Sequence, residues 1–171
     1  MKRMAVVLAS LMVAACASSQ KTSTAQTPQP GEKSATVAAN AASNSAAQME
    51  LDRLNAEILQ LQKQSDYFDY KKYAIKPQYQ SVIRNEAEFI QAHRNDFITL
   101  EGNADERGSD GYNLVLGEKR AEAVQKSLLK YGVPAAQIKL VSLGKGKPRL
   151  TCHEEKCWKE NRRVDFIHKL G

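Results

Sequence analysis

The segment 102–108 reads GNADERG and places three ionisable side chains, Asp105, Glu106 and Arg107, between two glycines. It directly follows the alternating stretch FITLEG at 97–102, which predicts a β-strand. Ligands of α/β sheets tend to bind beyond the carboxyl ends of strands. The segment is therefore a candidate catalytic site, metal site or ligand clamp, and ordinary loop polarity is the alternative.

Three kinds of chemistry fit the segment poorly. A glycosidase needs two carboxylates that face each other across a bond, whereas Asp105 and Glu106 are neighbours that would point apart on an extended segment. A metal site would need a histidine or further acids, and the segment has neither. The G-x-S-x-G motif of serine hydrolases does not occur in the sequence.

A clamp for a zwitterion needs one acid and one base, and Arg120 can supply the base. The stretch 112–131 predicts a helix that begins just after the segment and contains Arg120. Asp105 would then bind an ammonium group, while Arg120 would bind a carboxylate in bidentate fashion. Composition alone leaves open the alternative that Asp105 and Arg107 are loop charges and Arg120 a solvated helix residue.

The surrounding pattern predicts one domain at 65–171, a usual size for a single core. Strand-like stretches alternate with helical ones, in which Pro77 opens a helix to about His93 and the later helix has an apolar face. The strands are expected at 66–75, 97–102, 138–143 and 162–168, and the apolar face of helix 112–131 at Leu114, Ala121, Val124 and Leu128. This order implies an α/β (α+β) two-layer sandwich, with a βαβαβ-type mixed sheet of about four strands and helices on one face.

The first 15 residues predict a signal peptide, because Lys2 and Arg3 precede ten apolar or small residues, too few to span a bilayer. The letters VAAC then end at Cys16, which resembles the lipobox of bacterial lipoproteins. We therefore expect Cys16 to carry acyl chains, palmitate among them, that anchor the protein to a membrane. Ala17 follows, where an aspartate would favour the inner membrane, so analogy favours the outer membrane with the domain facing the periplasm.

Residues 16–47 are rich in Ala, Ser, Thr and Gln and contain no aromatic residue, which predicts a flexible linker after the lipidated cysteine. Residues 48–64 predict a short amphipathic helix. Its apolar face consists of Leu51, Leu54, Ile58 and Leu61. The face spans about two heptads, fewer than a sustained coiled coil requires. We expect the helix to fray or to dock on its own domain, and a dimer is the alternative.

The formal net charge of +6 falls to 23 − 19 = +4 without residues 1–15, which contain Lys2 and Arg3. This modest positive excess suits an anionic partner such as a cell-wall polymer. No basic patch is interleaved with aromatic residues, so nucleic acid is not expected as a partner.

Three stretches in register, LEGNADERGSDGYNLVLGEKRAEAV, VSLGKGKP and NRRVDF, resemble the OmpA-like peptidoglycan-binding domain. The resemblance runs from about Tyr67 to Ile167. It implies that Asp105 and Arg120 hold the diaminopimelate residue of the stem peptide, Asp105 through the ammonium and Arg120 through the carboxylate at the same centre. Further motif positions would line or brace this pocket: Asn103, Asn113, Leu116 and Arg162.

The resemblance also implies noncovalent binding without a cofactor or catalysis. The order of lipobox, linker and domain implies a tether between outer membrane and peptidoglycan, with the periplasmic protein TolB of the Tol system as partner in envelope integrity and cell division. The alternatives are an OmpA-like lipoprotein outside the Tol system and a cell-wall hydrolase. Lys71 departs from the family, because many members have an acid there, whereas Asp69 is retained.

The letters CHEEKC at 152–157 indicate a disulfide between Cys152 and Cys157, since an exported chain folds in an oxidising compartment. So small a loop would stabilise the fold by about 2 kcal/mol. The alternative is a metal site with His153. It would offer three ligands in a spacing that fits no common zinc pattern, so no metal is expected.

Overall fold

The computed structural model describes the backbone of residues 34–171 and the side chains of residues 44–171. The predicted signal peptide, Cys16 and the first half of the predicted linker lie outside the described residues. Within the described residues, no helix is both long and apolar enough to cross a membrane. Residues 42–171 form one compact unit, which contains the predicted domain.

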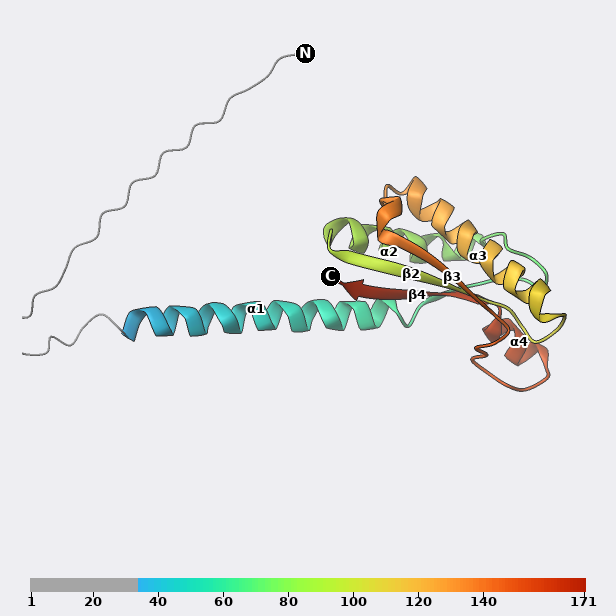
Figure 1. Ribbon diagram of the computed structural model, residues 1–171, viewed down its shortest axis with the longest axis horizontal. Coiled ribbons are helices and arrows are strands. Elements are labelled where there is room, and N and C mark those ends of the chain that lie inside the picture. Colours follow the sequence, from blue (N-terminus) through green and yellow to red (C-terminus); the bar gives the residue numbers. More distant parts are fainter. Residues whose placement is uncertain (1–33) are drawn as a thin grey trace, which may run out of the picture. The chain divides into compact units, whose positions relative to one another are not determined.

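The unit is built on a four-stranded sheet in the order β1-β4-β2-β3. The strands are β1 (Ser65–Tyr67), β2 (Asp96–Asn103), β3 (Ile138–Gly144) and β4 (Arg163–Leu170). Strand β4 is antiparallel to both of its neighbours, and β2 and β3 are parallel. Helices α2 (Gln80–Ala92) and α3 (Asp110–Lys130) cover one face of the sheet (Figure 1). The predicted two-layer α/β fold with a mixed sheet is confirmed.

Smaller elements complete the chain between these strands. One-turn helices η1 (Pro77–Tyr79) and η2 (Ala135–Gln137) precede α2 and β3, and α4 (Glu155–Asn161) precedes β4. Pro77 stands in the first turn of η1, where its missing N–H is not needed. The predicted helix from Pro77 to His93 therefore begins with η1 and continues as α2.

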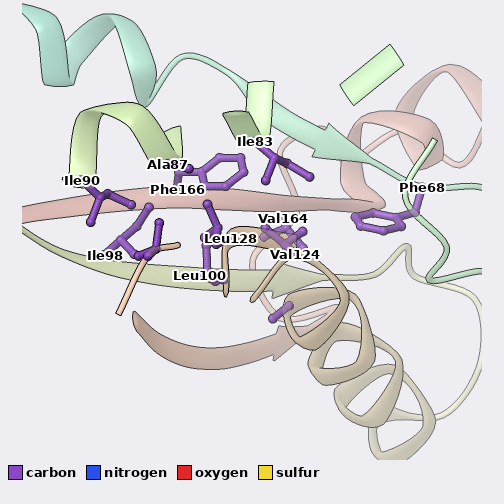
Figure 2. Close-up of a cluster of buried hydrophobic side chains, with 12 residues drawn as sticks. Phe68, Ile83, Ala87, Ile90, Ile98, Leu100, Val124, Leu128, Val164 and Phe166 are labelled. Atoms are coloured by element: carbon purple, nitrogen blue, oxygen red, sulfur yellow. The ribbon is translucent and has the colours of Figure 1, made fainter. Parts of the chain in front are cut away.

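The core lies between the two helices and the sheet (Figure 2). Ile98 and Leu100 point inward from β2 because alternate residues of a strand share one face. Helix α3 contributes Ala121, Val124 and Leu128, as predicted, but Leu114 is 47% exposed and does not belong to this face. In its first half the buried stripe of α3 includes two polar side chains, and it consists of Asn113, Leu116, Gly117 and Arg120.

Two predicted boundaries were wrong. Strand β1 ends at Tyr67 instead of continuing to Ile75, because the chain turns at Lys71, whose φ is +58°. Helix α1 (Ser34–Leu61) begins well inside the predicted linker 16–47. The alanines of this segment explain the difference, since alanine has the highest helix propensity.

The C-terminal end of α1 packs on the domain. Ile58 and Leu61 are buried against Phe89 of α2, and Leu170 of β4 packs against the same cluster. Leu51 is 44% exposed, so only the last two turns of the predicted apolar face are buried. Docking of this helix on its own domain is confirmed.

A buried polar cluster joins α2, β2 and β4. His168 contacts Asp96 through Nδ1 at 2.7 Å and Glu86 through Nε2 at 2.8 Å, and the three side chains have no exposed surface. Burial lowers the pKa of His168, but the two carboxylates outweigh it and raise that pKa to about 9. Protonated His168 therefore stabilises the folded state. This contribution is complete below its unfolded pKa of 6.5 and is lost as the pH rises through its folded pKa of about 9.

Two glycines let α3 touch the end of β2. A Cβ on Gly102 would lie 1.9 Å from the carbonyl oxygen of Gly117, and a Cβ on Gly117 would lie 2.6 Å from the carbonyl oxygen of Gly102. Both obstacles are backbone atoms, so neither could move without separating the helix from the strand. The contact fixes the distance between Arg120 on the helix and the turn after the strand.

We expect Gly102→Ala to lower the free energy of unfolding by at least about 2 kcal/mol, because α3 must move away from β2. Gly111→Ala is the matched control, since a Cβ at this position in the first turn of α3 would meet no atom within 4 Å. It should be neutral or stabilise by up to about 1 kcal/mol. Denaturant unfolding of both variants checks this, and equal stabilities would contradict the close contact.

Candidate functional site

The turn after β2 is organised around the carboxylate of Asp105, which is only 4% exposed. Its Oδ1 accepts hydrogen bonds from the backbone N–H and the Nε of Arg107, both at 3.1 Å, and its Oδ2 accepts one from Nη2 at 2.6 Å. The bond to the backbone N–H two residues on is an Asx turn. Gly108 continues the turn with a φ of +100°, which glycine adopts without strain.

Arg162, which lies between α4 and β4, approaches the same carboxylate. Its Nη1 donates to Oδ2 of Asp105 at 3.2 Å, its Nε donates to the carbonyl of Phe68 at 2.9 Å, and its Nη2 forms a short bond to Glu155. Burial raises the pKa of Asp105, but the hydrogen bonds from Arg107 and Arg162 outweigh burial and hold that pKa below its ordinary value. Asp105 is therefore ionised at neutral pH.

Arg120 has no exposed surface and points from α3 to the end of β2. Its three hydrogen bonds all go to backbone carbonyls: Nε to Lys72 at 3.0 Å, Nη1 to Asn103 at 2.7 Å and Nη2 to Asp69 at 3.2 Å. A guanidinium has five N–H donors, so two remain. Burial and the charge of Arg162 lower the pKa of Arg120 to about 10, and the charge of Asp105 acts in the opposite direction.

The predicted acid and base thus lie in one site without bonding to each other. Within residues 44–171, Asp105 pairs with Arg107 and Arg162, whereas Arg120 forms no ion pair. The site holds three guanidinium groups around the carboxylates of Asp105 and Glu155. Its local charge is positive, and the unpaired cation is Arg120.

The other predicted residues surround this pair. Asn103, at the end of β2, donates to the carbonyl of Glu101 at 2.9 Å and to Asp165 at 3.3 Å. Asn113 donates to the carbonyl of Arg107 at 3.1 Å and so fixes the turn to α3. Leu116 is buried on the same stripe of α3. Asn103 joins the end of β2 to β4, Asn113 positions the turn, and Arg162 is a direct partner of the acid.

Two aromatic rings hold Arg107 over Asp105. The guanidinium carbon lies 3.8 Å from the centre of the Tyr70 ring and 3.9 Å from the centre of the Trp158 ring. Such contacts favour a fixed guanidinium plane. The side chain of Glu106 is on the exposed side of the turn and accepts hydrogen bonds from Trp158 at 2.7 Å and from His153.

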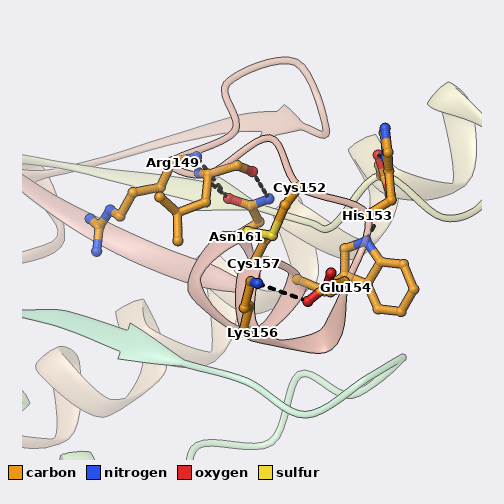
Figure 3. Close-up of a disulfide and its surroundings, with 10 residues drawn as sticks. Arg149, Cys152, His153, Glu154, Lys156, Cys157 and Asn161 are labelled. Carbon is orange, nitrogen blue, oxygen red and sulfur yellow. Dashed lines mark hydrogen bonds and ion pairs between the residues drawn. A yellow bond between two sulfur atoms is a disulfide. The ribbon is translucent and has the colours of Figure 1, made fainter.

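A disulfide joins Cys152 to Cys157 in the segment before β4, with 5.6 Å between the Cα atoms (Figure 3). The bond leaves no thiolate for the metal site that the sequence also allowed. Asn161 joins the two ends of this segment. Its side chain accepts a hydrogen bond from the N–H of Arg149 at 2.7 Å and donates one to the carbonyl of Leu150 at 2.7 Å. The closed segment carries Trp158 to the rim of the site.

Sequence reasoning missed several partners of the site. The spacing of Asp105 and Arg107 could have suggested their pairing, because an aspartate often bonds the backbone two residues on. Nothing local indicated Glu155 or Trp158, since both come from the connection before β4. The carbonyl partners of Arg120 were also missed, because every residue has a backbone carbonyl and the sequence does not indicate which of them accept hydrogen bonds.

The sequence pattern of the OmpA family matches residues 67–162, which include every residue of the site. The chain belongs to the OmpA family. Its relatives include proteins named peptidoglycan-associated lipoprotein. That of Pseudomonas putida is 43% identical over 100 residues, and that of Agrobacterium fabrum is 41% identical over 98 residues. The match takes in 57–58% of this chain but only 55–60% of the relatives' length.

Two solved structures have the same fold. The crystal structure of the peptidoglycan-associated lipoprotein from Burkholderia pseudomallei is 45% identical, with a TM-score of 0.61, and the match covers 61% of this chain and 89% of that chain. The C-terminal domain of Helicobacter pylori MotB, at 24% identity and a TM-score of 0.59, matches 63% of this chain and 85% of its own. The second likeness concerns the fold alone.

We expect Asp105→Asn to lower the free energy of unfolding by about 3 kcal/mol at pH 7, because it leaves buried guanidinium groups without their carboxylate. Because the pKa of Asp105 is lower in the folded protein, its carboxylate contributes its full stabilisation above the ordinary pKa of 3.8. This stabilisation is lost as the pH falls through the folded pKa, which lies below 3.8. The difference from wild type should therefore persist to about pH 4 and shrink below it. Thermal unfolding across this range measures it.

Glu106→Gln is the matched control, since it removes the neighbouring acid from the exposed side of the same turn. It should leave the melting temperature almost unchanged. If the two substitutions had equal effects, Asp105 would not be the centre of the turn.

Proposed function

We propose that the chain is an outer-membrane lipoprotein that tethers the outer membrane to peptidoglycan. The domain would bind the diaminopimelate residue of the stem peptide without catalysis, and Cys16 would carry the lipid. The observation that carries the proposal is the unpaired charge of Arg120, a buried guanidinium with two N–H groups left over beside an ionised Asp105. A ligand centre with one carboxylate and one ammonium complements both residues.

The relatives support this assignment. Proteins that match the site region are named for their association with peptidoglycan and as lipoproteins, and the matched region includes Asp105, Arg120 and Arg162. Arg107 now covers Asp105, so the ligand ammonium would have to take over hydrogen bonds that Arg107 makes.

The same contacts support our proposal that the domain binds its ligand without reaction. The acids at the site, Asp105 and Glu155, are both bonded to arginine, and these bonds hold both pKa values below their ordinary range. A general acid for cleavage of a glycosidic bond needs a raised pKa. The site therefore suits recognition of a charged peptide and not hydrolysis.

The ligand offers the sharpest test, because substitutions of Asp105 or Arg120 would also disturb the fold. Lysine in place of diaminopimelate keeps the side-chain ammonium and lacks only the carboxylate. Calorimetric titration of the full chain in detergent should show tighter binding of the diaminopimelate peptide, by about tenfold or more, the value of a hydrogen bond to a charged group.

Equal affinity for the two peptides would show that Arg120 does not bind the carboxylate. No binding of either peptide would overturn the proposed function.

We further propose that the protein acts in the Tol system, with TolB as its periplasmic partner. The alternative is a peptidoglycan-binding lipoprotein outside that system. Full-length protein on beads should retain TolB from a periplasmic extract and should lose it when soluble stem peptide is added, if the two partners share a surface. Absence of TolB under mild conditions would favour the alternative and leave the peptide-binding proposal intact.

A further inference from the structure

A cationic groove adjoins the candidate site. Its volume is about 430 Å³, and its lining consists of Tyr70, Lys71, Arg107, Gly108, Ser109 and Tyr112. Lys71 and Arg107 are the charged residues of this lining, and no acid is among them. The groove therefore combines two cations with aromatic walls, which suits a ligand that carries a negative charge.

Arg107 connects the groove to the site. One edge of its guanidinium bonds Asp105 through Nε and Nη2, whereas Nη1 makes no hydrogen bond within residues 44–171. The side chain is 27% exposed. An ammonium that bonds Asp105 would weaken the pair with Arg107, because one carboxylate would then serve an additional cation. Nη2 of Arg107 also lies 3.7 Å from Glu155, which Arg162 shares, so a ligand anion at the free Nη1 would add to this pairing.

Lys71 supplies the second cation. Within residues 44–171 it is the one non-glycine residue with a positive φ, at +58°, a backbone conformation that lysine seldom adopts. Its ammonium lies 5.2 Å from the centre of the Tyr70 ring and forms no ion pair with any described residue. Unusual backbone angles of this kind are found preferentially at functional sites.

We propose that Lys71 and Arg107 form a second carboxylate site. It would bind the free α-carboxylate of the glutamate that precedes diaminopimelate in the stem peptide, and Lys71 would select the acid form over the amide form. The inference rests on the proposed function, because the diaminopimelate residue must occupy Asp105 and Arg120 for the neighbouring residue to reach the groove.

The test compares two stem tripeptides that differ only in this carboxylate, present as the acid or as the amide, in calorimetric titrations of the full chain in detergent. Wild type should prefer the acid by about fivefold, the value of a partly exposed ion pair. Lys71→Gln should bring the ratio of affinities closer to one, because only Arg107 would remain to bind the carboxylate. Because both peptides are measured on each variant, a loss of folded protein would not change the ratio.

Lys126→Gln is the control, since it removes an exposed lysine from the far half of α3. It should keep the wild-type preference. If wild type binds both peptides equally, or if Lys71→Gln keeps the preference, the second carboxylate site is wrong and the proposed function stands. If wild type binds neither peptide, both inferences fail.

Discussion

The guanidinium of Arg120 is the point at which three segments of the domain meet. It reaches from α3 to the end of β2 and to the turn after β1, and each bond ends on a backbone carbonyl. A buried cation of this kind is costly unless its donors are satisfied. The contact between Gly102 and Gly117 fixes how deeply the Arg120 guanidinium is buried. The turn at Lys71 places the carbonyls of Asp69 and Lys72 within hydrogen-bonding distance of it.

Charge balance explains how the proposed binding site can fold without a ligand. The carboxylate of Asp105 is satisfied by Arg107 and Arg162, so the acid is stable in the free protein. Arg120 is satisfied only by dipoles, which stabilise a charge less than a carboxylate does. Peptide binding as proposed would then exchange partners among these arginines, and Arg107 would have to move, because Asp105 is only 4% exposed and Arg120 has no exposed surface.

The sequence predicted best what depends on neighbouring residues. Alternation identified β2, and the glycine and proline after α3 identified its end, because both signals are local. It failed where the cause is distant or unmarked. Leu114 fits the spacing of the apolar face, yet the buried position in that turn of α3 belongs to Asn113 of the polar site. Arg162 reaches Asp105 only because β4 lies between β1 and β2, and no periodicity reveals that order.

The short strand β1 has a mechanical consequence. A pull on the N-terminal side of the chain passes through the end of α1 into β1, which pairs with β4 over only three residues. The next residues along the chain are clasped side by side, Phe68 by Arg162 and Asp69 by Arg120. The load would reach the two arginines of the site before it reached the rest of the sheet. A tether built this way would carry tension through the same side chains that bind its ligand.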